Sequence, residues 1–265
     1  MKTGRAEYDS RTRTLAGTVP LVMGTKLSAL IVGAEENTAR SAWSRSVSLA
    51  GALESMLNRF DASSEVSLLN SGCDAGPRPV SSALEEILLA CKSYRDRTLG
   101  LFDITKGGGS YTVSRGSADM HGTTADFGGI AKGWFLRGCR QILQDAGIKD
   151  AFICFGNSSI LAMGHHPYGD CWKVSVVDPF SGKALTERDL RDISMSVSGN
   201  RPGYESHIID PRTHKGIPGR KVTVALAPDP ADAEVLSTAA MLATDEELET
   251  ITLRFDEADV KTYND

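Results

Sequence analysis

The sequence predicts an α+β fold in which the sheets are mixed and largely antiparallel and the helices are segregated from the strands. Two observations carry this prediction. Strand-like segments follow one another between residues 151 and 226 without a helical pattern between them, whereas doubly wound sheets alternate strands with helices. Helical spacing is confined to a few long segments elsewhere. With 265 residues and 41% hydrophobic residues, the chain (residues 1–265) is long enough for one large domain or two close lobes with a cleft between them.

The elements expected before residue 150 are a hairpin, three helices and two loops. Apolar, β-prone residues interrupted at Gly24-Thr25 indicate the hairpin, or a single bent strand. Ser82 and Glu85 form a capping-box pattern at the start of the second helix, and Gly147 ends the third. The expected bounds are residues 19–32 for the hairpin, 37–60, 82–94 and 130–146 for the helices, and 71–80 and 106–124 for the loops.

The elements expected after residue 150 are mostly strands. Alternating apolar residues predict an antiparallel meander of three strands, followed by three further strands and a short closing strand near Val260. A long helix begins at Pro230, because proline is favoured in the first turn of a helix. The expected bounds are residues 151–155, 160–163 and 172–177 for the meander, 193–198, 205–209 and 222–226 for the later strands, and 230–242 for the helix.

Composition excludes several classes of protein. The formal net charge of −5 argues against general nucleic-acid binding, which needs a basic face. The five cysteines form no Cys-x-x-Cys pair, so scattered thiols in a reducing compartment are expected rather than a disulfide framework or a zinc site. No apolar run approaches the about 20 residues of a membrane span. The N-terminus lacks a basic start followed by an apolar run, so the sequence as given indicates a cytoplasmic protein; a trimmed exported precursor would read the same way.

The first motif with chemical potential runs from Asp126 to Gly133 (Asp-Phe-Gly-Gly-Ile-Ala-Lys-Gly). A Gly-Gly turn that opens a helix leaves backbone N–H groups near one point, where the helix dipole favours an anion and Lys132 adds a positive charge. Asp126 is suited either to bind a polar group of a ligand or to cap the turn. The alternative is a tight turn with no ligand.

The second motif runs from Ser206 to Thr213 (Ser-His-Ile-Ile-Asp-Pro-Arg-Thr). His207 and Ile209 would share one face of a strand, with Ile208 on the other, before Asp210-Pro211 turns the chain. His207 has the chemistry of a general base or of a hydrogen-bond donor to phosphate. A structural histidine beside an Asp-Pro turn is the alternative.

The third motif places Glu234 and Thr238 four residues apart on the helix that begins at Pro230. Residues at this spacing lie on the same face of a helix. A carboxylate with a hydroxyl offers hard oxygen ligands, which suit Mg²⁺. An exposed glutamate and a packed threonine are the alternative.

These motifs belong to an ordered set that resembles the FAD:protein FMN transferases, the ApbE-type flavin transferases. The resemblance extends from about Pro20 to Ala243, and its most specific blocks are Gly128–Gly133 and His207–Thr213. The other blocks are Met23–Thr25, Asn58–Asn70, Gly100–Thr105, Ser198–Gly199, Val222–Val224 and Leu236–Ala239.

The resemblance implies an ApbE-like, T-fold-like architecture and a Mg²⁺-dependent reaction. FMN is moved from FAD to a Thr or Ser hydroxyl of a target protein and AMP is released, so FAD and a flavin-acceptor protein are the expected partners, with no nucleic acid. The implied flavin-site residues are Met23, Phe60, Leu101, Phe102, Asp103, Gly128, Trp134 and Ile208, with Asp126 added from its own motif. The implied metal ligands are the Ala131 carbonyl, Glu234 and Thr238, and the implied residue near the pyrophosphate is His207. Lys132 is added from its own motif as the second expected catalytic residue.

The sequence departs from the family pattern at several positions. Glu234 stands where the family usually has an aspartate, Phe60 where it often has a tyrosine, and Gly156–Ser159 where it usually has Gly-Gly-Asp. The segment 105–126 is short and lacks the usual proline after Phe-Asp. These departures keep open the alternative of a flavin-binding relative without catalysis. A second alternative is an FAD pyrophosphatase, because the same site could let water replace the acceptor hydroxyl and release FMN and AMP.

Overall fold

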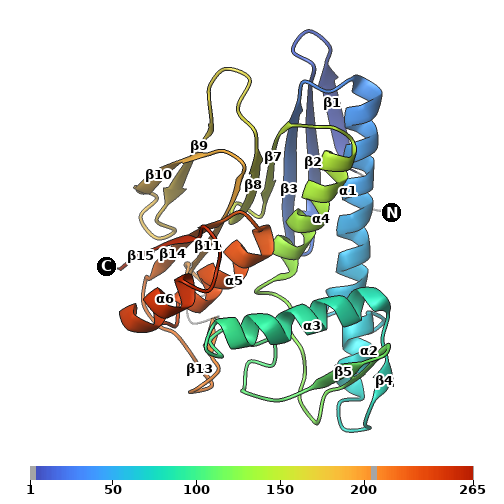
Figure 1. Cartoon of the computed structure of the whole chain (residues 1–265), viewed down its shortest axis with the longest axis vertical. Helices are drawn as coiled ribbons and strands as arrows, with labels where there is room; N and C mark the ends of the chain where they lie inside the picture. The colour runs from blue at the N-terminus through green and yellow to red at the C-terminus, as the bar shows by residue number, and fades with distance from the viewer. Residues whose placement is uncertain (1–3, 204–207, 265) are drawn as a thin grey trace.

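The computed structural model describes residues 4–203 and 208–264, and its centre is an eight-stranded sheet in which every neighbouring pair is antiparallel (Figure 1). The predicted α+β class with largely antiparallel sheets is therefore confirmed. In spatial order the strands are β1 (Arg5–Asp9), β2 (Thr14–Val22), β3 (Thr25–Val32), β7 (Asp150–Phe155), β8 (Ser159–Met163), β11 (Ile193–Gly199), β14 (Val222–Ala227) and β15 (Asp259–Tyr263).

Helices cover one face of this sheet and a small hairpin covers part of the other. α1, α4 and α5 contact β2, β8 and β11 respectively, and α3 lies with α2 and the small sheet β4–β6–β5 at the lower end of Figure 1. The described helices are α1 (Glu36–Leu57), α2 (Glu65–Ser71), α3 (Ser82–Arg97), α4 (Ala131–Asp145), α5 (Pro230–Ala240) and α6 (Asp245–Thr252). Among the described residues, no helix combines the length and apolar character that a bilayer span demands.

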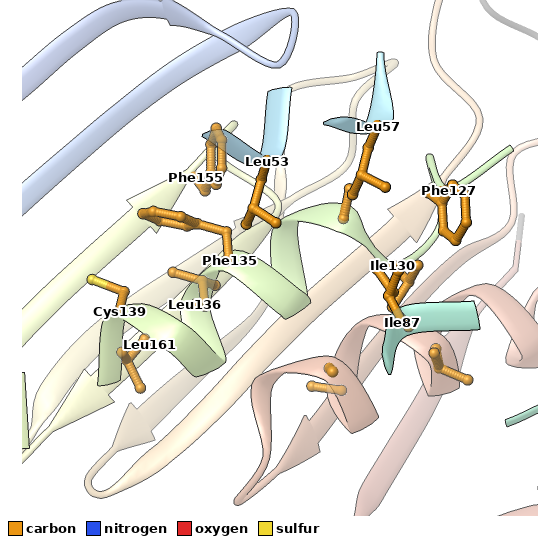
Figure 2. Close-up of a cluster of buried hydrophobic side chains, with 14 of the residues drawn as sticks. Leu53, Leu57, Ile87, Phe127, Ile130, Phe135, Leu136, Cys139, Phe155 and Leu161 are labelled. Carbon is orange, nitrogen blue, oxygen red and sulfur yellow. The ribbon is translucent and has the colours of Figure 1, made fainter. Parts of the chain in front are cut away.

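The alternation of side chains along β8 separates two apolar cores. Leu161 points to the helices and belongs to the larger core, whereas Ile160 and Ala162 point to the opposite face. Figure 2 shows the larger core around α4, where the Phe135 and Phe155 rings meet edge to face with centroids 5.0 Å apart. Because both faces of the central strands are buried, the strand register is strongly specified.

The predicted three-stranded meander is wrong in its third strand. Within residues 4–203 and 208–264, β9 (Trp172–Val177) pairs only with β10 (Ala184–Leu190), in a separate sheet, and the neighbour of β8 is β11 instead. The reason is burial: Trp172, Val176 and Leu190 pack on the face of the central sheet that the helices leave uncovered. The hairpin therefore closes the second core rather than extending the first sheet.

Three local expectations also change. Ser81, not Ser82, caps α3 by accepting a hydrogen bond from the Leu84 N–H (3.2 Å), and Glu85 accepts from the Gly116 N–H (3.0 Å) instead of completing a capping box.

The loop expected at 106–124 contains two short strands, β5 (Thr112–Ser114) and β6 (Ser117–Asp119). β6 pairs with β5 and with β4 (Arg78–Pro79). Most of the strand expected at 205–209 lies outside the described residues. The remaining short strands are β12 (Ile209–Asp210) and β13 (Lys215–Gly216).

The helices α4 and α5 approach each other most closely at Gly133. A β-carbon on Gly133 would lie 2.5 Å from the Pro230 carbonyl oxygen and 2.7 Å from Glu234 Cβ. The first of these atoms belongs to the backbone and cannot rotate away. Gly133 is therefore the residue that permits this contact, and the contact brings the start of α4 against the start of α5.

We expect Gly133→Ala to destabilise the protein by about 1–3 kcal/mol, because the added methyl group overpacks a backbone contact. Gly51→Ala is the matched control: Gly51 also lies within a helix, but a β-carbon added there would meet no atom within 4 Å, so alanine gains up to about 1 kcal/mol of helix propensity. Urea unfolding of both variants measures the difference. Equal stability of the two variants would contradict the described packing of α4 on α5.

Candidate functional site

A cavity of about 440 Å³ lies where the β2–β3 turn, the C-terminal end of α1 and the N-terminal end of α4 meet. This volume falls within the range of small-molecule sites. The residues that line it are Leu21, Met23, Gly24, Glu54, Leu57, Asn58, Arg59, Phe60, Asp126, Phe127, Gly128, Ala131 and Lys132. Segments from three separate parts of the sequence therefore meet at one concave surface.

The β2–β3 turn positions Met23 on the cavity wall. Val22 pairs with Thr25, so the turn contains only Met23 and Gly24, and both have positive φ angles of 49° and 76°. Two-residue turns of this kind match the twist of the flanking strands, but they strain a residue other than glycine, asparagine or aspartate. The Met23 N–H donates to Glu54 Oε1 (2.9 Å), which ties the turn to the end of α1.

Asp126 is a heavily hydrogen-bonded carboxylate on the cavity wall. One oxygen accepts from the Gly128 N–H (2.8 Å), and the other pairs with the Lys106 ammonium and with Arg59 Nε (3.1 Å). Burial of the carboxyl group raises its pKa, but Lys106, the Gly128 N–H and Arg59 together outweigh burial and hold the pKa of Asp126 below its ordinary value of 3.8. Asp126 is therefore an anion that gathers two cations at the cavity.

The Gly128-Gly129 helix start differs from the amide nest expected from the sequence. The Gly128 N–H is taken by Asp126, and the Ile130 and Ala131 N–H groups donate to the Phe127 carbonyl at 3.0 and 2.9 Å. These amides are occupied because the turn closes on itself before the helix begins. These three amides are therefore not available to an anion, which the helix dipole and the side-chain cations would still attract to this end of α4.

Lys132 points from α4 toward α5, where its ammonium forms an ion pair with Glu234 Oε1. The other carboxylate oxygen of Glu234 accepts hydrogen bonds from Ser159 Oγ at 2.6 Å and from Ser196 Oγ at 3.1 Å. Glu234 is only 4% exposed, so its charge depends on these partners. The alternative of an exposed surface glutamate is thus wrong, and Lys132 both lines the cavity and reaches Glu234.

Hydroxyl groups continue behind Glu234 as a buried polar layer between α5 and the sheet. Ser237 Oγ lies 3.0 Å from Ser196 Oγ and 2.8 Å from Ser198 Oγ, and Thr223 Oγ1 donates to the Ser237 carbonyl at 2.6 Å. Such a network is stable only when its members are satisfied. Here each hydroxyl has a partner, so the layer fixes where the Glu234 carboxylate stands.

Two of the expected metal ligands, Glu234 and Thr238, lie one turn apart on α5, and Thr238 faces the turn that precedes Ala131. Its Oγ1 would be 3.5 Å from a β-carbon on Gly129, two residues before Ala131. The Thr238 hydroxyl donates to the Glu234 carbonyl (3.1 Å), which leaves its oxygen lone pairs available. A carboxylate, a hydroxyl and a carbonyl match the hard oxygen chemistry of Mg²⁺. In donor chemistry these residues fit a divalent cation, but the carboxylate is already paired with Lys132.

The described residues contain no group of three or more His, Cys, Asp or Glu side chains placed to hold a metal ion. In this part of the chain, fewer than three such side chains therefore gather around Glu234, and the proposed ligand set contains one carboxylate. Mg²⁺ commonly binds in this way, because it retains water and takes further oxygens from substrate phosphates. The site is incomplete by itself and would need an anionic ligand.

The segment Leu101–Thr105 supports the cavity from behind. The Leu101 and Phe102 side chains are buried in the larger core, and a β-carbon on Gly129 would lie 3.4 Å from the Phe102 ring. Asp103 closes its own turn by accepting hydrogen bonds from Thr105 N and Oγ1, both at 2.8 Å. In the described part of the chain, the cavity is not lined by Leu101, Phe102 or Asp103, so the predicted contact of these residues with flavin stays a prediction.

The remaining predicted residues lie at the margins. Trp134 follows Lys132 on α4 and carries the Arg137 guanidinium 4.6 Å from its ring centroid. Ile208 is half-buried, and its carbonyl accepts from the Ile217 N–H at 3.0 Å. His207 falls outside the described residues. The contacts of Trp134, Ile208 and His207 with FAD therefore stay predictions.

Sequence reasoning missed the residues that hold Asp126 in place. Arg59 and Lys106 pair with its carboxylate, and Asn70 fixes the preceding residue by accepting from the Ala125 N–H (2.8 Å) and donating to the Ala125 carbonyl (2.9 Å). Arg59 and Asn70 stand within a block that the resemblance already marked. Lys106 gave no signal, because it reaches Asp126 only after the chain has folded.

Comparison with known proteins gives a family match over most of the chain. The model of the ApbE family matches residues 23–121 and 112–260. A protein of Rhodobacter capsulatus called FAD:protein FMN transferase is 32% identical over 130 residues, which cover 46% of this chain and 24% of that protein. The match therefore spans about a quarter of the length of that curated relative.

Solved structures share the fold at low sequence identity. The flavin transferase ApbE from Vibrio cholerae aligns with a TM-score of 0.79 and 19% identity over 98% of this chain and 97% of that one. The ApbE protein of Thermotoga maritima aligns with a TM-score of 0.76 and 20% identity over 97% and 93% of the two chains. The arrangement of sheet, helices and hairpin is thus the fold of these proteins.

We expect Asp126→Asn to lower stability at neutral pH by about 1–2 kcal/mol, since Lys106 and Arg59 lose their partner and solvent screens part of the loss. The folded-state pKa of Asp126 lies below 3.8, so its contribution is complete above that value and disappears as pH falls through the folded-state pKa. Melting temperatures of wild type and variant should therefore converge as the pH falls below 3.8. A gap that stays constant over the acid range would contradict the described ion pairs.

Proposed function

This chain belongs to the ApbE family, and from that premise we propose that it is an FAD:protein FMN transferase. The observation that carries the proposal is that residues from separate parts of the family match line one cavity. Three sequence blocks shared with the family, around Met23, Phe60 and Gly128, line the same concave surface. The name of the Rhodobacter capsulatus relative supports the same activity.

The proposed reaction is a phosphoryl-type transfer. The hydroxyl oxygen of a threonine or serine in the acceptor protein attacks the phosphorus on the FMN side of the FAD pyrophosphate. A phosphoester bond forms, the bond from that phosphorus to the bridging oxygen breaks, and AMP leaves with the electron pair. The hydroxyl proton passes to a base, for which His207 is our candidate from the family resemblance. Such reactions depend mainly on positioning and on neutralising charge around phosphorus.

Cationic side chains near the cavity support binding of a pyrophosphate. Arg59, Lys106 and Lys132 all reach its wall or the Asp126 carboxylate on it. In a partly enclosed cavity such charges act more strongly than in bulk water. We assign Lys132 and Arg59 to orienting the phosphates, and the apolar rim formed by Leu21, Met23 and Phe60 to contact with the flavin ring.

The proposed metal ligands are the Ala131 carbonyl, Glu234 and Thr238. A Mg²⁺ ion held by these residues would supply positive charge that neutralises the charge developing during transfer. The donor chemistry supports this assignment, as does the short separation between the Gly129 turn and Thr238. The chain's own contribution is to hold one carboxylate at a fixed point through Ser159 and Ser196.

Flavin binding without turnover is the second candidate function. The observation that favours it is the ion pair between Lys132 and Glu234, which neutralises the only carboxylate of the proposed metal site among the described residues. If this pair persists with FAD bound, the protein would retain FAD intact.

Incubation with FAD and Mg²⁺, with and without a purified acceptor protein, separates the candidates. A transferase releases AMP while FMN becomes covalently attached, seen as in-gel flavin fluorescence that disappears when the acceptor threonine is changed to alanine. A pyrophosphatase releases AMP and free FMN in equal amounts, and a binding protein quenches FAD fluorescence without releasing AMP. Failure to bind FAD at high micromolar concentration would contradict all three.

We expect Glu234→Gln to reduce AMP release by about 100-fold, because the variant loses the one charged ligand of the proposed metal site. Glu246→Gln is the matched control, since Glu246 is an exposed carboxylate on α6 and its loss should leave the rate unchanged. Chromatography of AMP over time measures both variants. A rate in Glu234→Gln equal to that of wild type would reject the proposed metal site.

A further inference from the structure

Lys132 stands between two sites that both need a positive charge. Its side chain lines the cavity at the start of α4, and its ammonium pairs with Glu234 on α5. Within the described ranges, no other Lys, Arg or His lies at ion-pair distance from Glu234. One flexible cation therefore connects the ligand cavity with the buried carboxylate.

Glu234 cannot easily exist without a counter-ion in this position. It is 4% exposed, and its second oxygen already accepts hydrogen bonds from Ser159 and Ser196. Hydroxyl groups stabilise the carboxylate but do not cancel its charge. Without a ligand, the Lys132 ammonium is the group that does so.

A divalent cation and an ammonium group compete for the same carboxylate oxygen. Glu234 Oε1 faces Lys132, while Oε2 faces the serines of the sheet. A metal that used Oε1 would lie beside Lys132 and be repelled by it. The lysine must move before the metal binds, and its four-carbon stem allows the ammonium to swing toward the cavity.

We propose that Lys132 is a built-in counter-ion that keeps divalent cations away from Glu234 until an anionic ligand draws the ammonium into the cavity. The ligand's phosphates then take Lys132, and Glu234 becomes available to the metal. Metal and phosphate ligand thus bind with strong positive coupling, and the coupling acts in both directions. This inference rests on the proposed function only in naming FAD as the anionic ligand. The competition between the Lys132 ammonium and a divalent cation for Glu234 does not depend on that function.

The test measures Mn²⁺ binding in the absence of any nucleotide, by the electron paramagnetic resonance of unbound Mn²⁺ at about pH 8, where carboxylates are ionised. Lys132→Met removes the charge and keeps most of the stem. We expect this variant to bind Mn²⁺ at least about tenfold more tightly than wild type, because the competing ammonium is gone. Affinity equal to or weaker than that of wild type would overturn the proposal.

Two further variants locate the effect. Lys183→Met removes an exposed lysine on the turn between β9 and β10, a hairpin that packs on the opposite face of the sheet, so it should change Mn²⁺ affinity by less than about twofold. The double variant Lys132→Met/Glu234→Gln should lose the gain completely. A gain that survives in the double variant would place the ion elsewhere and overturn the proposal.

A measurement on the wild-type protein guards against misfolding of the variants. Mn²⁺ should bind wild type at least about tenfold more tightly with saturating FAD than without it, and FAD should bind more tightly by the same factor in Mn²⁺. Equal Mn²⁺ affinity with and without FAD would overturn the proposal. If Lys132→Met gains Mn²⁺ affinity but wild type neither transfers FMN nor releases AMP, the proposed function fails while the counter-ion role stands.

Discussion

The contact between α4 and α5 at Gly133 determines where the charges of the site stand. Because Gly133 has no side chain, the first turns of the two helices touch, and Lys132 reaches Glu234 across the contact. The same contact places the start of α4 on the wall of the cavity, since Ala131 and Lys132 line it. Any residue larger than glycine would push the two helices apart. The cavity and the buried Glu234 carboxylate would then also lie farther from each other.

The sheet contributes to this site through small hydroxyl residues rather than through its apolar core. Ser159 on β8 and Ser196 on β11 point to the helix face and meet Glu234, whereas their neighbours Ile160 and Met195 fill the opposite core. The two faces of the same strands thus have different roles. One supports an electrostatic site, and the other is packed by the β9–β10 hairpin.

The elements that sequence periodicity predicted well are those whose apolar residues repeat over many positions, such as α1, α4 and β14. Those it missed depend on distant partners. β10 has few apolar residues and forms because β9 pairs with it, and α2 is too short to show a repeat. In the site, the family resemblance marked Met23, Phe60 and Gly128, which do line the cavity. The roles of Lys106 and the serines follow from tertiary contacts that no local pattern encodes.

The two outer strands of the central sheet, β1 and β15, carry exposed charged side chains in alternation: Arg5, Glu7 and Asp9 on β1, and Asp259 and Lys261 on β15. An open sheet edge displays unpaired backbone groups that invite another strand. A second chain adding to either edge would have to remove these charges from water, which opposes pairing. The sheet can therefore remain open at both ends without becoming a template for aggregation.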